Sequence, residues 1–370
     1  MTSETTESAQ SGRSVSRKDY VLMAVSIYLF VSSIEMIKIS AKALGHGGVD
    51  YIVGLIRGPI TGVFAGWFGT ALVQSSGAFD SIVVALVSAG VIPMITAVGI
   101  ILGAEVGTTI TSLLVSVMGY MRRNIEMFKS TFIIALIHFW YNVGTLLICL
   151  TLELSLGVFS NIALIGRDFF SQVPGMALIP SVFDLVSPWV KFVLRYVPGW
   201  IGLIGGCVLL IFALSRSERY MTRVFKTDVN RRLLNTAFGS VTKSLLAGFI
   251  FTVLVPSTSV MVSLLIPLAA AGIIDASYNI LPYILGANIG TVFDVMIASL
   301  ATGDPAAIGV WLVHLANNII GAVVFLPLLR QFSSFVEKTN DFLTVSWKRT
   351  VTFVALFHTL PLLLILSAFM

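Results

Sequence analysis

The chain has 370 residues, a mean hydropathy of +0.95 and only 11% charged side chains. Because soluble domains carry about 25% charged residues, this composition excludes an ordinary soluble fold and predicts an all-α polytopic membrane protein. The net charge of +5 does not indicate nucleic-acid binding, because the basic residues lie mainly between apolar segments, where they set the topology.

The chain begins with a tail, residues 1–19, that is rich in Ser, Thr and Glu, a composition typical of disorder. The segment 20–57 contains the first apolar window, Val21–Ile37. We expect this helix to be retained, since it is long for a signal peptide and contains Glu35. Arg13, Arg17 and Lys18 precede it, so the N-terminus is predicted to be cytoplasmic.

Four more apolar windows approach or exceed the roughly 18 residues of a spanning helix. They are Thr131–Leu152, Val197–Leu214, Ile308–Leu329 and Val351–Met370. Basic clusters at residues 122–129 and 216–232 predict cytoplasmic loops. Lys348 and Arg349 precede the last window, which predicts a C-terminus outside.

Two segments, 58–152 and 237–330, repeat one another. Three blocks match in the same order: Ala65–Ile92 with Ala247–Ile274, Gly103–Thr109 with Gly286–Val292, and His138–Asn142 with His314–Asn318. Between the repeats we expect an extracytoplasmic loop at 153–196 and a helix with a basic loop at 197–236. A linker and a last helix would occupy 331–370. Repeats of this kind are typical of secondary transporters, whose sites lie between the two halves.

Interrupted apolar segments in corresponding positions point to the binding site of such a transporter. Gln74–Gly77 corresponds to Pro256–Ser259. Serine hydroxyls can donate to an anion or accept toward a cation, glycine allows close approach to the backbone, and proline ends a helix. The alternative is that these small residues only pack helices closely. The pairing across repeats favours a site.

Three carboxylates, Asp80, Glu105 and Asp294, lie in strongly apolar surroundings. Charges there are costly, so each is a functional-site hypothesis, unless it lies at a hairpin mouth in water. Three ionised acids at one place would repel an anion. Either a cation neutralises them, or one is protonated, or they do not share one site.

These motifs resemble the type II sodium-phosphate cotransporters and their bacterial relatives. The resemblance rests on TALVQSSG ending at Gly77, on GANIGT at Gly286–Thr291 and on the two His-x-x-x-Asn pairs. It implies two inverted repeats, each with a re-entrant helical hairpin and a broken transmembrane helix. It also implies sodium-coupled uptake of inorganic phosphate by alternating access, and it allows a homodimer in the cell membrane.

The chain departs from that family's pattern at several positions of the motifs. Gly77 replaces the last Ser of Gln-Ser-Ser-Ser, and Pro256 replaces the second Gln. Glu105 stands where Asn is usual, and Asp294 stands where Thr is usual. Asp80 stands where a small hydroxyl residue would be typical.

Three groups of residues follow as candidates. Phosphate would be bound by Ser75, Ser76, Gly77, Ser257, Thr258 and Ser259. Sodium binding or coupling would involve Gln74, Asp80, Glu105, Thr108, Asn288, Thr291 and Asp294. Structural bracing of the hairpins would come from His138, Asn142, His314 and Asn318.

We find no nucleotide-binding loop, nucleophile elbow or metalloprotease pattern. We therefore expect no enzyme and no cofactor, with sodium as the only metal ion. Two alternatives remain: transport of another anion or with proton coupling, and a non-transporting membrane scaffold or regulator with a degenerate site.

Overall fold

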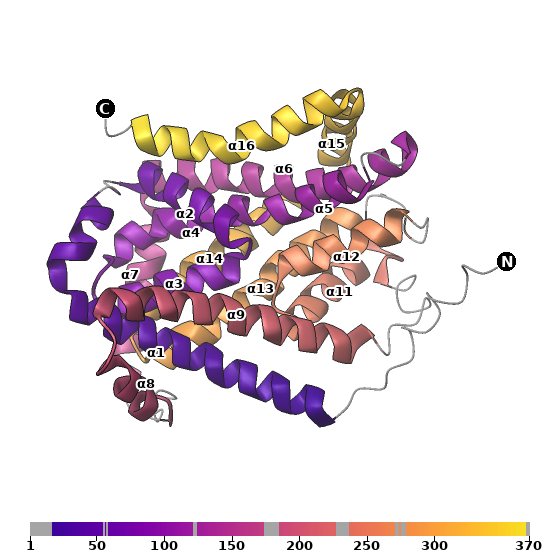
Figure 1. The fold of residues 1–370 in the computed structure, drawn as a ribbon. Helices are drawn as coiled ribbons and strands as arrows, with labels where there is room; N and C mark the ends of the chain where they lie inside the picture. Colours follow the sequence, from indigo (N-terminus) through magenta and orange to yellow (C-terminus); the bar gives the residue numbers. More distant parts are fainter. Residues whose placement is uncertain are drawn as a thin grey trace.

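A computed structural model describes residues 17–54, 56, 58–120, 124–173, 185–226, 237–270, 274 and 279–367, and its regular elements are all helices (Figure 1). Residues 1–16 of the predicted tail, Arg57, and residues 122, 123 and 227–232 of the predicted basic loops lie outside these ranges. The helices are α1 (Arg17–Gly54), α2 (Pro59–Val73), α3 (Ser76–Ser88), α4 (Met94–Thr108), α5 (Ile110–Tyr120), α6 (Ile125–Leu156), α7 (Val158–Ser171), α8 (Ser187–Leu194), α9 (Gly199–Lys226), α11 (Val241–Leu254), α12 (Thr258–Ala270), α13 (Ile280–Thr302), α14 (Pro305–Phe325), α15 (Leu329–Thr344) and α16 (Trp347–Ser367).

Seven spans within the described residues are long and apolar enough to cross a membrane. They are α1, α4 with α5, α6, α9, α13, α14 and α16. The chain is therefore a multi-pass membrane protein. Seven crossings put the start of α1 and the end of α16 on opposite sides, and these two points lie at opposite ends of the bundle in Figure 1.

Each repeat begins with a pair of short helices, α2–α3 in the first and α11–α12 in the second. These helices have 13 to 15 residues, fewer than a spanning helix needs. Three spans lie between the first pair and the second: α4 with α5, α6 and α9. Counting crossings from α1 onward, the two pairs open toward opposite sides, as inverted repeats require. Their re-entrant position in a bilayer stays a prediction.

The second repeat lacks the broken long helix that we expected in both repeats. In the first repeat α4 and α5 are separated at Thr109, whose N–H bonds to the Val106 carbonyl at 3.2 Å and whose hydroxyl bonds to the same oxygen at 2.7 Å. A side-chain hydroxyl of this kind competes with the helical backbone pattern. The corresponding residue in the second repeat is Val292, which has no hydroxyl, and α13 is continuous.

In each repeat the first hairpin helix packs against the long helix that follows it, α2 against α4 and α11 against α13. A methyl group on Gly103 would lie 1.9 Å from the Val63 carbonyl oxygen, and one on Gly286 would lie 1.9 Å from the Leu245 carbonyl oxygen. These glycines therefore allow direct backbone contact between the helices, as small residues often do in membrane proteins.

The remaining helices surround this two-repeat bundle. α1 packs along α9, α8 packs against α1, and α15 and α16 cover α6 and α2 (Figure 1). The predicted connection 153–196 contains α7 and α8 in its described part. α1 begins at Arg17, so the last three residues of the predicted tail are helical. The other domain boundaries stay predictions.

Replacing Gly286 by Ala should push α13 away from α11, because the added methyl group overlaps the Leu245 carbonyl oxygen. We expect a destabilisation of about 1–3 kcal/mol, typical of overpacking, seen as a lower unfolding temperature of the purified protein in detergent. Gly58→Ala is the control, since nothing lies within 4 Å of a methyl group there and its backbone is extended. Equal unfolding temperatures for the two variants would contradict this packing.

Candidate functional site

The first hairpin turns within two residues, between the end of α2 at Val73 and the start of α3 at Ser76. Gln74 has a left-handed backbone (φ 62°), and its N–H still bonds to the Thr70 carbonyl at 2.7 Å. Ser75 is extended, and its hydroxyl accepts the Ala78 N–H at 3.3 Å, which caps α3. The Gln-Ser pair thus ends one helix and begins the next, which leaves both side chains at the tip.

The second hairpin makes the same break with a different residue. α11 ends at Leu254, and Val255 is non-helical before Pro256, as expected for a residue preceding proline. The Ser257 hydroxyl accepts the Val260 N–H at 3.3 Å and so caps α12. Ser75 and Ser257 therefore perform the same capping role in the two repeats, although Pro256 offers no side-chain ligand.

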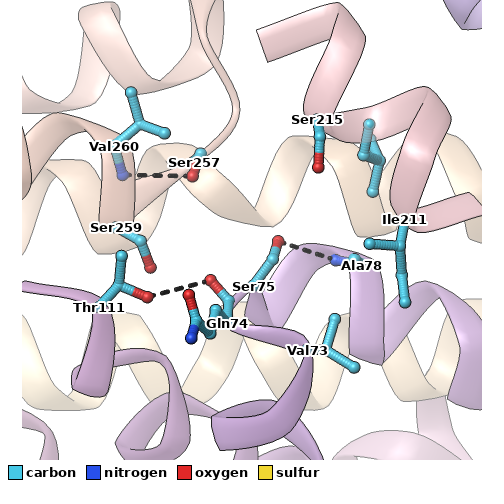
Figure 2. Close-up of a pocket in the computed structure, with 11 residues that line it drawn as sticks. Val73, Gln74, Ser75, Ala78, Thr111, Ile211, Ser215, Ser257, Ser259 and Val260 are labelled. Carbon is cyan, nitrogen blue, oxygen red and sulfur yellow. Dashed lines mark hydrogen bonds between the residues drawn. The ribbon is translucent and has the colours of Figure 1, made fainter. Parts of the chain in front are cut away.

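The two tips face one another across a cavity of about 230 Å³ (Figure 2). At about 30 Å³ per water molecule it has room for roughly seven waters. Its lining is Val73, Gln74, Ser75, Ala78, Thr111, Ile211, Leu214, Ser215, Ser257, Ser259 and Val260. None of these side chains is charged. The polar surface consists of hydroxyls and one amide, from the tips of the two hairpins and from α5 and α9.

Four of the predicted site residues line this cavity: Gln74, Ser75, Ser257 and Ser259. Ser76 and Thr258 are buried behind the tips. Sequence reasoning missed Thr111 and Ser215. Thr111 could have been found as the counterpart of Asp294, whereas Ser215 lies on α9, outside both repeats, where no motif marked it.

Hydroxyl contacts join the two repeats next to the cavity. The hydroxyls of Thr108 and Ser259 lie 2.7 Å apart, and the Ser259 hydroxyl also reaches the Thr108 carbonyl at 3.2 Å. The Thr258 hydroxyl donates to the Ala287 carbonyl at 3.2 Å, within its own repeat. Thr291, the counterpart of Thr108, is buried in α13. The second tip is thus held by hydrogen bonds from both repeats.

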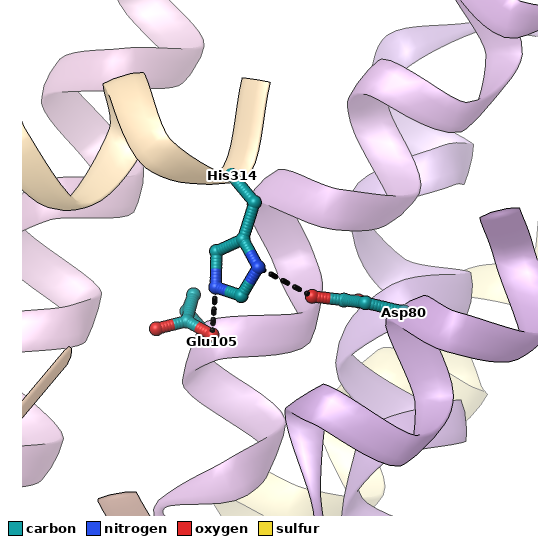
Figure 3. A group of neighbouring side chains, drawn as sticks. All are labelled: Asp80, Glu105 and His314. Carbon is teal, nitrogen blue, oxygen red and sulfur yellow. Dashed lines mark hydrogen bonds and ion pairs between the residues drawn. The ribbon is translucent and has the colours of Figure 1, made fainter. Parts of the chain in front are cut away.

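Two of the predicted carboxylates meet at a histidine (Figure 3). His314 Nε2 lies 3.1 Å from Glu105 Oε1, and His314 Nδ1 lies 3.3 Å from Asp80 Oδ2. All three side chains are buried. The Glu105 contact has the geometry of a hydrogen bond, whereas the Asp80 contact is an ion-pair distance without a hydrogen bond. One positive charge on the imidazole would interact with both carboxylates.

This cluster is the one group of potential metal ligands found among the described residues. Hard cations prefer oxygen ligands, and here an imidazole already contacts both carboxylates. We therefore interpret the Asp80–Glu105–His314 cluster as an internal ion-pair network. A role of Asp80 and Glu105 as direct sodium ligands stays a prediction.

The equivalent histidine of the first repeat has only neutral hydrogen-bond partners among the described residues. His138 Nδ1 lies 3.4 Å from the Ser112 hydroxyl, and the Asn142 amide donates to the His138 carbonyl at 3.0 Å. The Asn288 amide donates to Asn142 Oδ1 at 2.8 Å across the repeats. Asn318 bonds to the His314 carbonyl at 3.3 Å in the same manner as Asn142. These contacts join α6 to α5 and α13, and the bracing of the hairpins stays a prediction.

The family model described as Na+/Pi-cotransporter matches residues 29–165 and 209–345, which is well over half of the chain. The chain belongs to this family. The two matched segments contain both repeats in full, and the family is one of transporters.

The chain is similar to "Sodium-dependent phosphate transport protein 2A" of Ovis aries, with 25% identity over 83% of this chain and 60% of the relative. It is similar to the same protein of Rattus norvegicus over the same shares. The chain thus spans about three fifths of the length of these relatives. "Uncharacterized protein YqeW" of Bacillus subtilis is 23% identical over 85% of this chain and 84% of the relative. No solved structure matches.

Two departures from the Na+/Pi-cotransporter motif meet in space. A methyl group on Gly77, in the first repeat, would lie 1.6 Å from Oδ2 of Asp294, in the second repeat. The Asp294 carboxylate therefore lies where a side chain at position 77 would lie. It also accepts the Val295 N–H at 2.7 Å through Oδ1. The absence of a side chain at Gly77 and the carboxylate at Asp294 therefore fit one another in space.

Gly77→Ser alone should destabilise the protein, because the new side chain overlaps the Asp294 carboxylate. Adding Asp294→Thr should restore much of the loss, since it removes the overlapping group. The loss should be about 1–3 kcal/mol, measured as the unfolding temperature in detergent. Asp294→Thr combined with the wild-type Gly77 is the control. If the double variant loses the sum of the two single effects, the two positions are not coupled.

His314→Leu should be far more damaging than His138→Leu, although both histidines are buried. The first change leaves two buried carboxylates without their cation, which costs about 3–5 kcal/mol for a broken buried pair. The second removes contacts with neutral groups only. Unfolding temperatures of both variants test this, together with His314→Leu combined with Asp80→Asn and Glu105→Gln, which should recover stability. Equal losses for the two single variants would refute the ion-pair interpretation.

Proposed function

We propose that this protein is a secondary active transporter that takes up inorganic phosphate together with sodium by alternating access. The observation that carries the proposal is the cavity between two oppositely oriented hairpin tips, lined by Gln74, Ser75, Ser257 and Ser259. It joins the two repeats at the place where transporters with inverted repeats bind their substrates. The relatives are named as sodium-dependent phosphate transport proteins, and this supports the choice of substrate.

Phosphate could be bound here without a basic side chain. The N-termini of α3 and α12 adjoin the cavity, and free backbone N–H groups at a helix N-terminus attract anions. The hydroxyls of Ser75, Ser257 and Ser259 can donate to phosphate oxygens or accept toward sodium. The described lining residues include no arginine or lysine, which leaves the anion to be balanced by co-transported cations.

Alternating access would come from movement of the hairpin-bearing bundle against the outer helices. α9 lines one side of the cavity with Ile211, Leu214 and Ser215 and packs along α1, so the α1–α9 pair forms a wall outside both repeats. We propose that the hairpins slide past this wall to expose the cavity to each side. We also propose a cell-membrane location with a cytoplasmic N-terminus; the homodimer stays a prediction.

One observation favours coupling to protons instead of sodium: the His314 imidazole lies between Asp80 and Glu105. Such a chain of buried ionisable groups is typical of proton pathways. A non-transporting scaffold would instead show no response to ligands at all.

The test is uptake of radiolabelled phosphate into proteoliposomes, driven by an inward sodium gradient and compared with an equal potassium gradient. We expect uptake only with sodium. Ser75→Ala and Ser257→Ala should each reduce it at least about tenfold, the effect expected when a hydrogen bond to a charged ligand is lost. Ser155→Ala, an exposed hydroxyl at the far end of α6, should leave uptake unchanged.

Uptake that follows an inward proton gradient without sodium would replace sodium by protons in the proposal. Absence of uptake in a folded, correctly inserted protein, with no stabilisation by phosphate, would reject phosphate transport and favour another anion or the scaffold.

A further inference from the structure

We propose that the α15–α16 corner, residues 335–349, is a binding site for an anionic phospholipid of the surrounding membrane. The headgroup binds between Lys338 and Arg349, and the acyl chains lie against Phe335 and Phe342. The inference goes beyond the proposed function and does not depend on what the protein transports. It follows from the place of α15 in the fold and from the side chains on its exposed surface.

α15 connects the last two spans at one end of the bundle. Six of the seven spans precede it, so α15 lies on the same side of the membrane as the start of α1. The orientation proposed above makes this the cytoplasmic side. In Figure 1 α15 runs across the direction of α6 and α16, as expected for a helix that lies in the membrane interface.

The side chains of α15 form three sectors around the helix axis. The first sector faces the protein, and its buried members are Phe332, Val336, Asn340, Leu343 and Thr344. The second carries Phe335 and Phe342, which are seven residues apart on one side of the helix and are 47% and 60% exposed. The third carries Arg330, Glu337 and Asp341, all of them exposed. An interfacial helix faces protein, hydrocarbon and water in this manner.

The aromatic sector adjoins the membrane-spanning part of the bundle. The ring centroid of Phe335 lies 5.2 Å from that of Trp140 on α6, in an edge contact. Trp140 also contacts Phe353 and Phe357 of α16, each at 6.1 Å. These three residues lie within spans. The side of α15 that carries Phe335 and Phe342 therefore faces the hydrocarbon of the bilayer.

Two cations adjoin the aromatic sector. Lys338 follows Phe335 by three residues and precedes Phe342 by four, so all three side chains lie on the same side of the helix. The Arg349 guanidinium lies over the Phe342 ring, 4.6 Å from its centroid, and donates to the Phe342 carbonyl at 3.3 Å. Both cations are exposed, and neither forms an ion pair with a described residue.

The other charges of this region do not compete for the two cations. Glu337 and Asp341 belong to the third sector, and Asp341 is paired with Lys129 of α6 at 3.5 Å. Lys348 is a further exposed cation of the corner. Trp347 is 61% exposed there, and tryptophan is enriched at membrane interfaces.

An anionic phospholipid matches the chemistry of this corner. Its phosphate is attracted to lysine and arginine next to a span, by about fivefold in affinity for each cation near the surface. Its acyl chains cover exposed aromatic rings that face hydrocarbon. A zwitterionic phospholipid has the same chains but no net charge, so a comparison of the two lipids isolates the contribution of the cations.

Trp347 lies at the corner, two residues before Arg349, and reports directly on lipid contact. Brominated acyl chains quench the fluorescence of a tryptophan that they touch. The purified protein in detergent micelles is titrated with dibrominated phosphatidylglycerol and, separately, with dibrominated phosphatidylcholine. We expect stronger quenching by phosphatidylglycerol at equal mole fractions. Trp347→Phe should lose most of this excess.

Lys338→Gln combined with Arg349→Gln should weaken the apparent affinity for phosphatidylglycerol at least about tenfold and leave the phosphatidylcholine titration unchanged. The matched control is Arg167→Gln combined with Lys243→Gln, which removes the same charge from exposed side chains of α7 and α11. It should leave both titrations within about twofold. Lys338→Gln alone should weaken the affinity about fivefold, and it tests the site if the double variant does not fold.

Three results would overturn the inference. Equal quenching of the wild-type protein by the two lipids would show that the corner does not select an anionic headgroup. A full excess in Trp347→Phe would place the lipid elsewhere. Equal weakening by the two double variants would show general attraction to charge and no site. None of these results bears on phosphate uptake into proteoliposomes, so failure of this inference is distinguishable from failure of the proposed function.

Discussion

A helix that ends inside an apolar bundle leaves backbone N–H and C=O groups without partners, and this constraint governs the whole site. Such groups are costly in a membrane unless protein, ligand or water satisfies them. Here Ser75 and Ser257 each satisfy one N–H at the start of α3 and α12. The N–H groups left over are the positive ends of two helices, and they adjoin one cavity. The same chain break that costs stability therefore creates the surface at which we propose that the anion binds.

Close helix packing makes these breaks tolerable. The glycines of α4 and α13 bring those helices into backbone contact with α2 and α11, so the hairpins are surrounded by protein along much of their length. The His314 cluster and the Asn142–Asn288 pair then join the long helices of one repeat to those of the other. The polar groups inside the bundle are thus concentrated along the surface between the repeats, where relative motion would have to occur.

Internal repetition explains which parts of this arrangement could be predicted from the sequence. Both hairpin tips and the paired histidines recur in the same order in the two repeats, so one occurrence supports the other. The continuous α13 could have been anticipated from Val292, which lacks the hydroxyl of Thr109. The contacts of His314 with Glu105 and of Asp294 with Gly77 could not be anticipated from the sequence. Each joins residues more than 200 positions apart and breaks the symmetry that made the repeat visible. Ser215 lies on α9, outside the blocks that match between the two repeats.

We interpret the departures from the family motif as an altered site and not as decay of the site. A degenerate site would lose ligands one at a time, without regard to their neighbours. Instead, the acid gained at Asp294 occupies the space left at Gly77, and the acids gained at Asp80 and Glu105 lie on either side of His314. Buried charges without a partner are strongly destabilising, so these acids persist only together with the groups that accommodate them. Such coupled changes keep a charged site intact while altering its balance of charge, which is the property that decides which ions it can hold.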